Sequence, residues 1–214
     1  MKYTHIVWDF NGTLLDDIKA GIDAVNVMLA ERGLATIDSV DAYRELFCFP
    51  IIEYYEKLGF DFEKEDYYNV LAPIWVAMYL ENYKQSELMP GAKQTLRALG
   101  DLGYRQVLLS ATELQMLKGQ LQDHTLENYF DQVCGLDNIH AGGKVGAAIA
   151  WRAQNPDAHP LFIGDTVHDY EVACAVGADC ILYCQGHQSY AQLAGCGCPI
   201  IDDLSKLVEL LAAQ

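Results

Sequence analysis

Three aspartates, a serine and a lysine stand where apolar segments of this chain end or where a helical pattern begins. Asp9 follows the run THIVW, Ser110 ends the run QVLLS, and Asp165 directly follows PLFIG. Asp169 lies four residues beyond Asp165, and Lys144 opens a helical pattern. Taken singly, such an aspartate is more often a helix cap, and such a lysine is usually solvated. Together, the carboxylates offer oxygen ligands that suit Mg²⁺, and the lysine and hydroxyl suit a phosphoryl group.

The segments that must position these side chains alternate between strands and helices. Short apolar runs bounded by turn residues or acids predict buried strands at residues 4–8, 106–110, 160–164 and 180–184. Helical patterns lie at residues 90–103, 144–154 and 168–177. This alternation predicts an α/β fold with a parallel sheet, in which ligands bind beyond the carboxyl ends of the strands. Asp9, Ser110 and Asp165 should therefore lie along one edge of the sheet.

The interval 16–88 differs, because it carries helical patterns and no convincing strand. It begins with an amphipathic helix, Ser39 can cap a second helix, and Pro50 can open a third. A longer pattern over residues 63–84 should be kinked or split at Pro73. Most of the aromatic side chains here should form the core of a helical bundle, and a few could face a substrate.

The length of 214 residues suffices for one core with a smaller inserted domain. We therefore predict an α/β core over residues 1–15 and 89–214, interrupted by an all-helical domain over residues 16–88. The composition is that of a globular protein, with 51% hydrophobic and 21% charged residues. No apolar run reaches the roughly 20 residues of a membrane helix, and the start does not resemble a signal peptide, so we expect a cytoplasmic protein.

The net charge of −16 argues against a nucleic-acid partner, since phosphate backbones would be repelled. A small anionic substrate would need a local cation: a metal ion, a lysine or helix N-termini. An odd number of cysteines, seven, indicates free thiols. Cys196 and Cys198 lack a second pair at zinc spacing, and their role stays open. The chain has no Walker loop, nucleophile elbow or zinc-protease motif.

Four segments, in order along the chain, resemble the four motifs of the haloacid dehalogenase-like hydrolases. DFNGTLLD, Asp9 to Asp16, resembles the first signature, which reads D-x-D-G-T-L-x-D in phosphatases of that family. LLSAT, with Ser110, resembles the second motif, and Lys144 matches the third. GDTVHDYEVACAVGAD, residues 164–179, closely resembles the fourth. The first and fourth matches are highly specific, and the second is weak.

The segment LENYFDQVCGLD, residues 126–137, is similar to part of the phosphoglycolate phosphatase-like branch of that family. The third motif departs from the usual Lys-Pro, because Val145 follows the lysine. The resemblance covers the whole chain. It implies a Rossmann-like parallel sheet with an inserted helical cap domain, and Mg²⁺-dependent phosphatase activity on a small phosphorylated metabolite.

The resemblance also implies a role for each residue of the constellation. Asp9 would be the nucleophile and form an aspartyl-phosphate. Mg²⁺ would be held by Asp9, the backbone carbonyl of Asn11 and Asp165, with Asp169 in support. The residues implied to hold the phosphoryl group or its loop are Gly12, Thr13, Ser110, Ala111 and Lys144.

Asn11 departs from the family at the position of the second aspartate of the first motif. In phosphatases of the family this aspartate protonates the leaving oxygen and then activates water, and an amide can do neither. Such catalysis contributes about 10²–10⁴ in rate. The protein could be a slow phosphatase, favour good leaving groups such as acyl phosphates, borrow an acid from the cap or from Asp16 or Asp17, or bind phosphate without turnover. The sequence does not identify the substrate or the oligomeric state.

Overall fold

The computed structural model describes residues 2–212, which contain a six-stranded, all-parallel sheet in the order β5-β4-β1-β6-β7-β8. The strands are β1 (His5–Trp8), β4 (Arg105–Glu113), β5 (Gln132–Leu136), β6 (Pro160–Gly164), β7 (Asp179–Tyr183) and β8 (Ile200–Ile201). This arrangement confirms the predicted α/β fold. The half-buried edge strand β5 and the short strand β8 were not expected, because β5 includes Gln132 and Gly135 and β8 is only two residues long.

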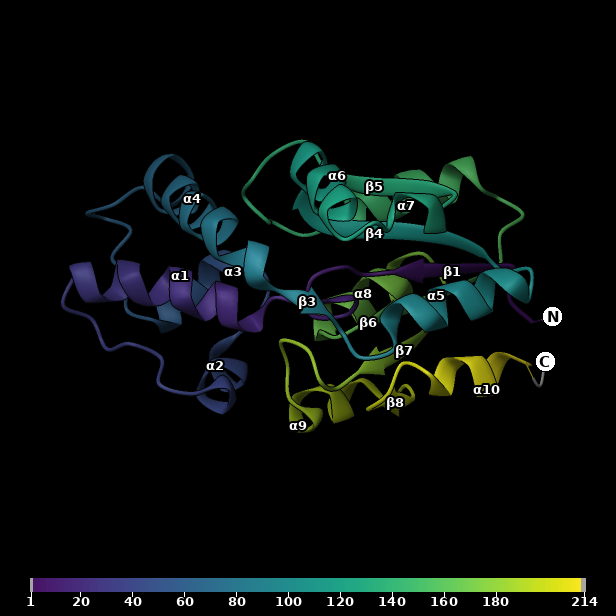
Figure 1. Cartoon of the computed structure of the whole chain (residues 1–214). Coiled ribbons are helices and arrows are strands. Elements are labelled where there is room, and N and C mark those ends of the chain that lie inside the picture. The colour runs from purple at the N-terminus through teal and green to yellow at the C-terminus, as the bar shows by residue number, and fades with distance from the viewer. Residues whose placement is uncertain (1, 213–214) are drawn as a thin grey trace.

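Helices cover both faces of the sheet, as the near-continuous apolar strands require. Ile6 and Trp8 pack on one face, and Val7 between them packs on the other. The first face is covered by α5 (Ala92–Asp101), α6 (Leu114–Asp123) and α10 (Lys206–Ala212). The opposite face is covered by α7 (Val145–Gln154), α8 (Val167–Ala175) and α9 (Tyr190–Leu193). In Figure 1, α5 and α10 run side by side along the sheet.

Four helices form a separate cluster beyond the carboxyl ends of the strands (Figure 1). They are α1 (Ile18–Glu31), α2 (Val40–Leu46), α3 (Ile51–Lys57) and α4 (Ala72–Asn82). We refer to residues 18–82 as the helical segment. Pro73 lies in the first turn of α4, where proline is tolerated, and a π-helical turn over Tyr67–Leu71 precedes it. The long helical pattern is therefore split near Pro73, as predicted.

The chain crosses between the sheet and the helical segment at a two-stranded antiparallel ribbon. The ribbon pairs β2 (Leu15–Asp16) with β3 (Glu87–Leu88). The expectation that residues 16–88 contain no strand is therefore wrong at both ends of this interval. A two-residue ladder is too short to leave an alternating pattern in the sequence. Within residues 2–212, no helix combines the length and apolar character needed to span a bilayer.

Candidate active site

The candidate site forms where the central strand β1 ends between its two neighbours. Trp8, the last residue of β1, pairs with Leu108 of β4 and with Ile163 of β6. Asp9 therefore emerges between the two strands that carry Ser110 and Asp165. The strand order changes direction around β1, and such a switch point is where open α/β sheets bind ligands.

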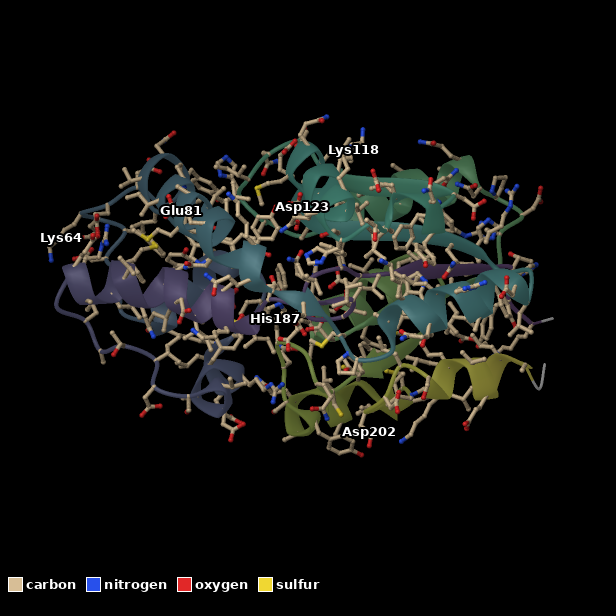
Figure 2. All side chains as sticks on the ribbon, viewed as in Figure 1. Lys64, Glu81, Lys118, Asp123, His187 and Asp202 are labelled. Carbon is tan, nitrogen blue, oxygen red and sulfur yellow. The ribbon has the colours of Figure 1, made fainter. Side chains whose placement is uncertain are left out.

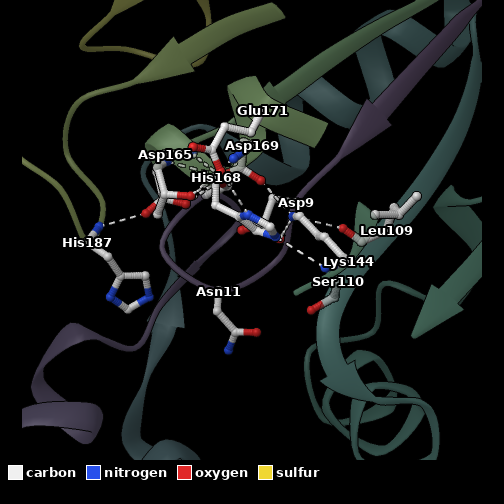
Figure 3. Close-up of polar contacts among 12 residues, drawn as sticks. Asp9, Asn11, Leu109, Ser110, Lys144, Asp165, His168, Asp169, Glu171 and His187 are labelled. Carbon is white, nitrogen blue, oxygen red and sulfur yellow. Dashed lines mark hydrogen bonds and ion pairs between the residues drawn. The ribbon is translucent and has the colours of Figure 1, made fainter. Parts of the chain in front are cut away.

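Carboxylates from two strand ends meet a lysine from a third element at this point (Figure 3). Oxygens of Asp9, Asp165 and Asp169 all lie within 4.8 Å of one another. The ammonium of Lys144, at the start of α7, forms an ion pair with Asp9 and lies 2.6 Å from Asp169 Oδ1. It also donates to the Leu109 carbonyl across 3.1 Å. The structure thus brings together the four charged side chains that the sequence separates by up to 160 residues.

Hydrogen bonds fix the orientation of both carboxylates that follow β6. Asp165 Oδ1 accepts from the Thr13 hydroxyl at 2.7 Å, and Asp165 Oδ2 accepts from the backbone N–H of His187 at 2.7 Å. Asp169 Oδ2 accepts from the hydroxyl and the backbone N–H of Thr166, which completes a capping box at the start of α8. Asp169 is therefore a helix cap through one oxygen and a partner of Lys144 through the other.

Three glycines allow this close packing of acids. A Cβ atom on Gly12 would lie 2.3 Å from Asp165 Oδ2, and a Cβ on Gly186 would lie equally close to the same oxygen. A Cβ on Gly164 would lie 2.1 Å from the carboxyl carbon of Asp169. The backbone thus approaches both carboxylates more closely than any other residue type would permit.

Negative charge exceeds positive charge in this cluster. Burial raises the pKa of Asp9 well above its usual range; Lys144 opposes this effect, and the other two carboxylates reinforce it. Burial also raises the pKa of Asp165 to about 6. Burial would lower the pKa of Lys144, but Asp169 and Asp9 outweigh that effect and raise it. Three carboxylates around one ammonium favour the arrival of a further cation.

The Asn11 amide has its hydrogen-bonding capacity taken up by neighbours. Its Nδ2 donates to Asp17 Oδ2 at 2.8 Å and to the Tyr79 hydroxyl at 2.9 Å. Its Oδ1 accepts from the Thr112 hydroxyl at 2.8 Å. Tyr79 in turn donates to Asp17 Oδ2 and accepts from Gln120. Asn11 therefore joins the loop after β1 to helix α4 and to the end of β4.

Asp17 and His187 form a second buried ion pair beside Asn11. His187 Nε2 lies 3.3 Å from Asp17 Oδ1, and its Nδ1 lies 2.8 Å from the Tyr43 hydroxyl. Burial would lower the pKa of His187, but the Asp17 carboxylate outweighs burial and raises it to about 9. Burial likewise opposes ionisation of Asp17, yet His187 lowers its pKa below the usual value. Asp17 is thus ionised at neutral pH and holds no proton to donate.

His187 and Gly186 were not among the candidate residues of the sequence. They follow β7, so they lie at the same edge of the sheet as Asp9 and Asp165. The only signal in the sequence was their place just after a strand of the parallel set. Figure 2 shows His187 at the junction between the sheet and the helical segment.

The helical segment contacts the loops of the site directly. Phe47 stacks on His187, and Phe49 stacks on His168, each with ring centres 4.8 Å apart. Arg44 of α2 donates to the backbone carbonyl of Gly186 at 2.8 Å. These contacts close the helical segment over the carboxyl ends of the strands.

A cavity of about 140 Å³ lies between the helical segment and the carboxylate cluster. The candidate residues that line it are Asp9, Asn11, Ser110, Ala111, Lys144 and Asp169. The other candidate residues, Gly12, Thr13 and Asp165, are not part of the lining of this cavity. Thr13 is fully buried and supports Asp165, and the Gly12 N–H already donates to Asp17 Oδ1 and to the Leu15 carbonyl.

Comparison with known proteins agrees with this architecture. The family model of the haloacid dehalogenase-like hydrolases matches residues 6–183, and the chain belongs to this family. A phosphoglycolate phosphatase from Pseudomonas savastanoi pv. phaseolicola is 26% identical over 214 residues, which cover 95% of this chain and 78% of that protein.

Solved structures share the fold. A haloacid dehalogenase-like hydrolase from Streptococcus pneumoniae superposes with a TM-score of 0.83 at 18% identity, covering 98% of this chain and 99% of that one. A predicted phosphatase from Clostridium acetobutylicum superposes with a TM-score of 0.78 at 19% identity, covering 99% of each chain. The segment between residues 18 and 82 is included in both alignments, so it belongs to the shared architecture.

Proposed function

We propose that this chain is a Mg²⁺-dependent phosphatase that acts on a small phosphorylated metabolite through Asp9. The observation that carries the proposal is the convergence of Asp9, Asp165 and Asp169 at the switch point of the sheet, where Asp9 and Asp169 also pair with Lys144. The phosphoglycolate phosphatases among the relatives support a phosphoric monoester as substrate.

The residues present fit a divalent cation. The cluster offers only oxygen donors, and its negative charge exceeds that of Lys144. We propose that Asp9, the Asn11 backbone carbonyl and Asp165 hold Mg²⁺, and that Asp169 orients Lys144. When bound, the ion would offset the charge of the carboxylates and of the phosphoryl oxygens.

Each group of residues at the site has a separate role in the proposed reaction. A carboxylate oxygen of Asp9 forms a bond to phosphorus while the bond to the leaving oxygen breaks, and water then releases phosphate from Asp9. Ser110 and Lys144 line the cavity beside Asp9 and are the groups that would hold the phosphoryl oxygens. We propose residues 16–88 as a cap domain that closes over the substrate and excludes water.

Substitution of Asp9 tests this function. Asp9→Asn should abolish Mg²⁺-dependent phosphate release from a panel of phosphorylated metabolites that includes acyl phosphates. Mass spectrometry of acid-quenched wild-type protein should show a phosphoryl adduct that Asp9→Asn lacks. Turnover that survives Asp9→Asn would refute the assignment.

A second candidate function is phosphate binding without turnover. The observation that favours it is Asn11, which cannot exchange a proton and is tied to Asp17, Tyr79 and Thr112. A wild-type protein that binds phosphate with Mg²⁺ but hydrolyses nothing in the panel would establish this second function.

A further inference from the structure

Most of the residues that the helical segment contributes to the lining of the cavity are aromatic, and the others are small or aliphatic. The rings that the helical segment contributes include Tyr43, Phe47, Phe49, Tyr54, Trp75 and Tyr79. Several of them pack edge to face or stack on one another, so their positions are mutually fixed. The part of a substrate that lies beyond its phosphoryl group would therefore contact a rigid, largely apolar surface.

The helical segment contributes no cation to this cavity. Arg32 pairs with Glu65, and Arg44 is bound to backbone carbonyls of the loop after β7. The lysines of the segment also lie outside the lining, and Lys64 stands at the end of the segment far from His187 (Figure 2).

The two cations that do line the cavity come from elsewhere and already have partners. Lys144 forms ion pairs with Asp9 and Asp169, and His187 forms an ion pair with Asp17. A carboxylate on the leaving group, as in phosphoglycolate, would be desolvated against aromatic rings without a partner, which is strongly unfavourable.

The size of the cavity limits the leaving group. Its volume of about 140 Å³ includes the space beside Asp9 and Lys144, and an apolar cavity of roughly 150 Å³ in another protein binds a single benzene molecule. The space beyond the phosphoryl group therefore suits at most one ring and is too small for a nucleoside.

Tyr54 contributes its ring to this wall. Its side chain is 4% exposed and lines the cavity, whereas its hydroxyl is buried without a hydrogen-bond partner in the described chain. The wall therefore stays apolar at this position.

Asn11 restricts the leaving group independently of the cavity wall. An amide cannot protonate the departing oxygen, so a leaving group that is stable as an anion is favoured. A phenol-type oxygen, with a pKa of about 10 as in tyrosine, leaves far more readily than an alkoxide.

We propose, building on the phosphatase function above, that the substrate is an aryl phosphate: the monoester of a small phenol or hydroxylated heteroaromatic ring without a carboxylate. The bond between phosphorus and the aryl oxygen breaks, and its electron pair stays on the aryloxide, which takes a proton from solvent. Asp9 receives the phosphoryl group. Water then attacks phosphorus, frees the Asp9 carboxylate and loses its proton to solvent, so the net products are a phenol and inorganic phosphate.

Non-hydrolysable analogues test ring recognition separately from turnover. In the presence of Mg²⁺, phenylphosphonate should bind to the wild-type protein at least about 10-fold more tightly than phosphonoacetate, measured by calorimetry. Equal affinities, or tighter binding of phosphonoacetate, would overturn the aryl proposal, whether or not the protein hydrolyses any phosphate.

Kinetics with different substrates distinguish the contribution of ring binding from that of leaving-group stability. Phenyl phosphate has both, acetyl phosphate has a good leaving group without a ring, and benzyl phosphate has a ring with a poor leaving group. We expect kcat/KM for phenyl phosphate to exceed that for each of the others, and for phosphoglycolate, by about 10-fold or more. A preference for phosphoglycolate would refute the aryl class and leave the phosphatase function standing; no hydrolysis of any of them would refute that function alone.

Discussion

The amide of Asn11 donates a hydrogen bond across 2.8 Å to Asp17 Oδ2, at the position where the family's phosphatases carry a second aspartate. A carboxylate at position 11 would therefore face the Asp17 carboxylate at hydrogen-bond distance. Two carboxylates so close share one proton, and one of the two pKa values rises. His187 keeps Asp17 ionised. The Asn11 amide can donate a hydrogen bond to this carboxylate, whereas an aspartate at position 11 could do so only in its protonated form.

Asn11→Asp should raise steady-state turnover by about 10-fold or more, because the new carboxylate can serve as acid and base. It should also lower thermal stability through repulsion with Asp17. The double variant Asn11→Asp/Asp17→Asn should recover part of that stability and keep the faster rate. Asp17→Asn alone is the control and should not accelerate turnover. An unchanged rate in both variants that carry Asn11→Asp would contradict the role given to the amide.

The wild-type protein should show burst kinetics with 4-nitrophenyl phosphate. The first step needs no acid with such a leaving group, whereas hydrolysis of phosphorylated Asp9 lacks the base that Asn11 cannot provide. Stopped-flow absorbance should record about one equivalent of nitrophenolate per protein before a slower steady state. Asn11→Asp should shrink the burst by accelerating the second step. A linear time course from the first turnover would instead place the slow step before release of the phenol.

The ion pair between His187 and Asp17 should make the stability of the metal-free protein depend on pH. Because the pKa of His187 rises from 6.5 to about 9 on folding, its contribution is full below pH 6.5 and is lost as pH rises through about 9. The shift corresponds to about 3 kcal/mol. In EDTA, His187→Gln should lower the urea midpoint at pH 6.5 and approach wild type near pH 10. A difference that persists unchanged at pH 10 would mean that packing, not charge, is lost.

Gly186→Ala should weaken Mg²⁺ binding. The added Cβ would lie 2.3 Å from Asp165 Oδ2 and must displace this carboxylate or the loop that donates to it. Disturbing such an orienting contact typically costs about 10–100-fold in metal affinity, which calorimetry can measure. Gly195→Ala is the matched control, because a Cβ there meets nothing within 4 Å. Equal Mg²⁺ affinity in both variants would contradict the proposed role of Asp165 as a ligand.

The sequence by itself determined the parallel sheet and the residues at its carboxyl edge. Apolar runs followed by Asp9 and Asp165 are local signals, and parallel pairing places the ends of such runs along one edge. The capping box of Thr166 and Asp169 and the cap at Ser39 are also local, so their spacing shows in the chain.

Only the tertiary structure decided what surrounds Asn11. Its partners Asp17, Tyr79 and Thr112 come from three elements, and His187 reaches the same place from a fourth, so no periodic pattern connects them. The aromatic lining of the cavity, and the absence of a lysine or arginine of the helical segment from that lining, likewise follow from how the helices pack together. The sequence gives the chemical type of each side chain. Its protonation state, its hydrogen-bond partners and the space around it depend on contacts between segments far apart in the chain.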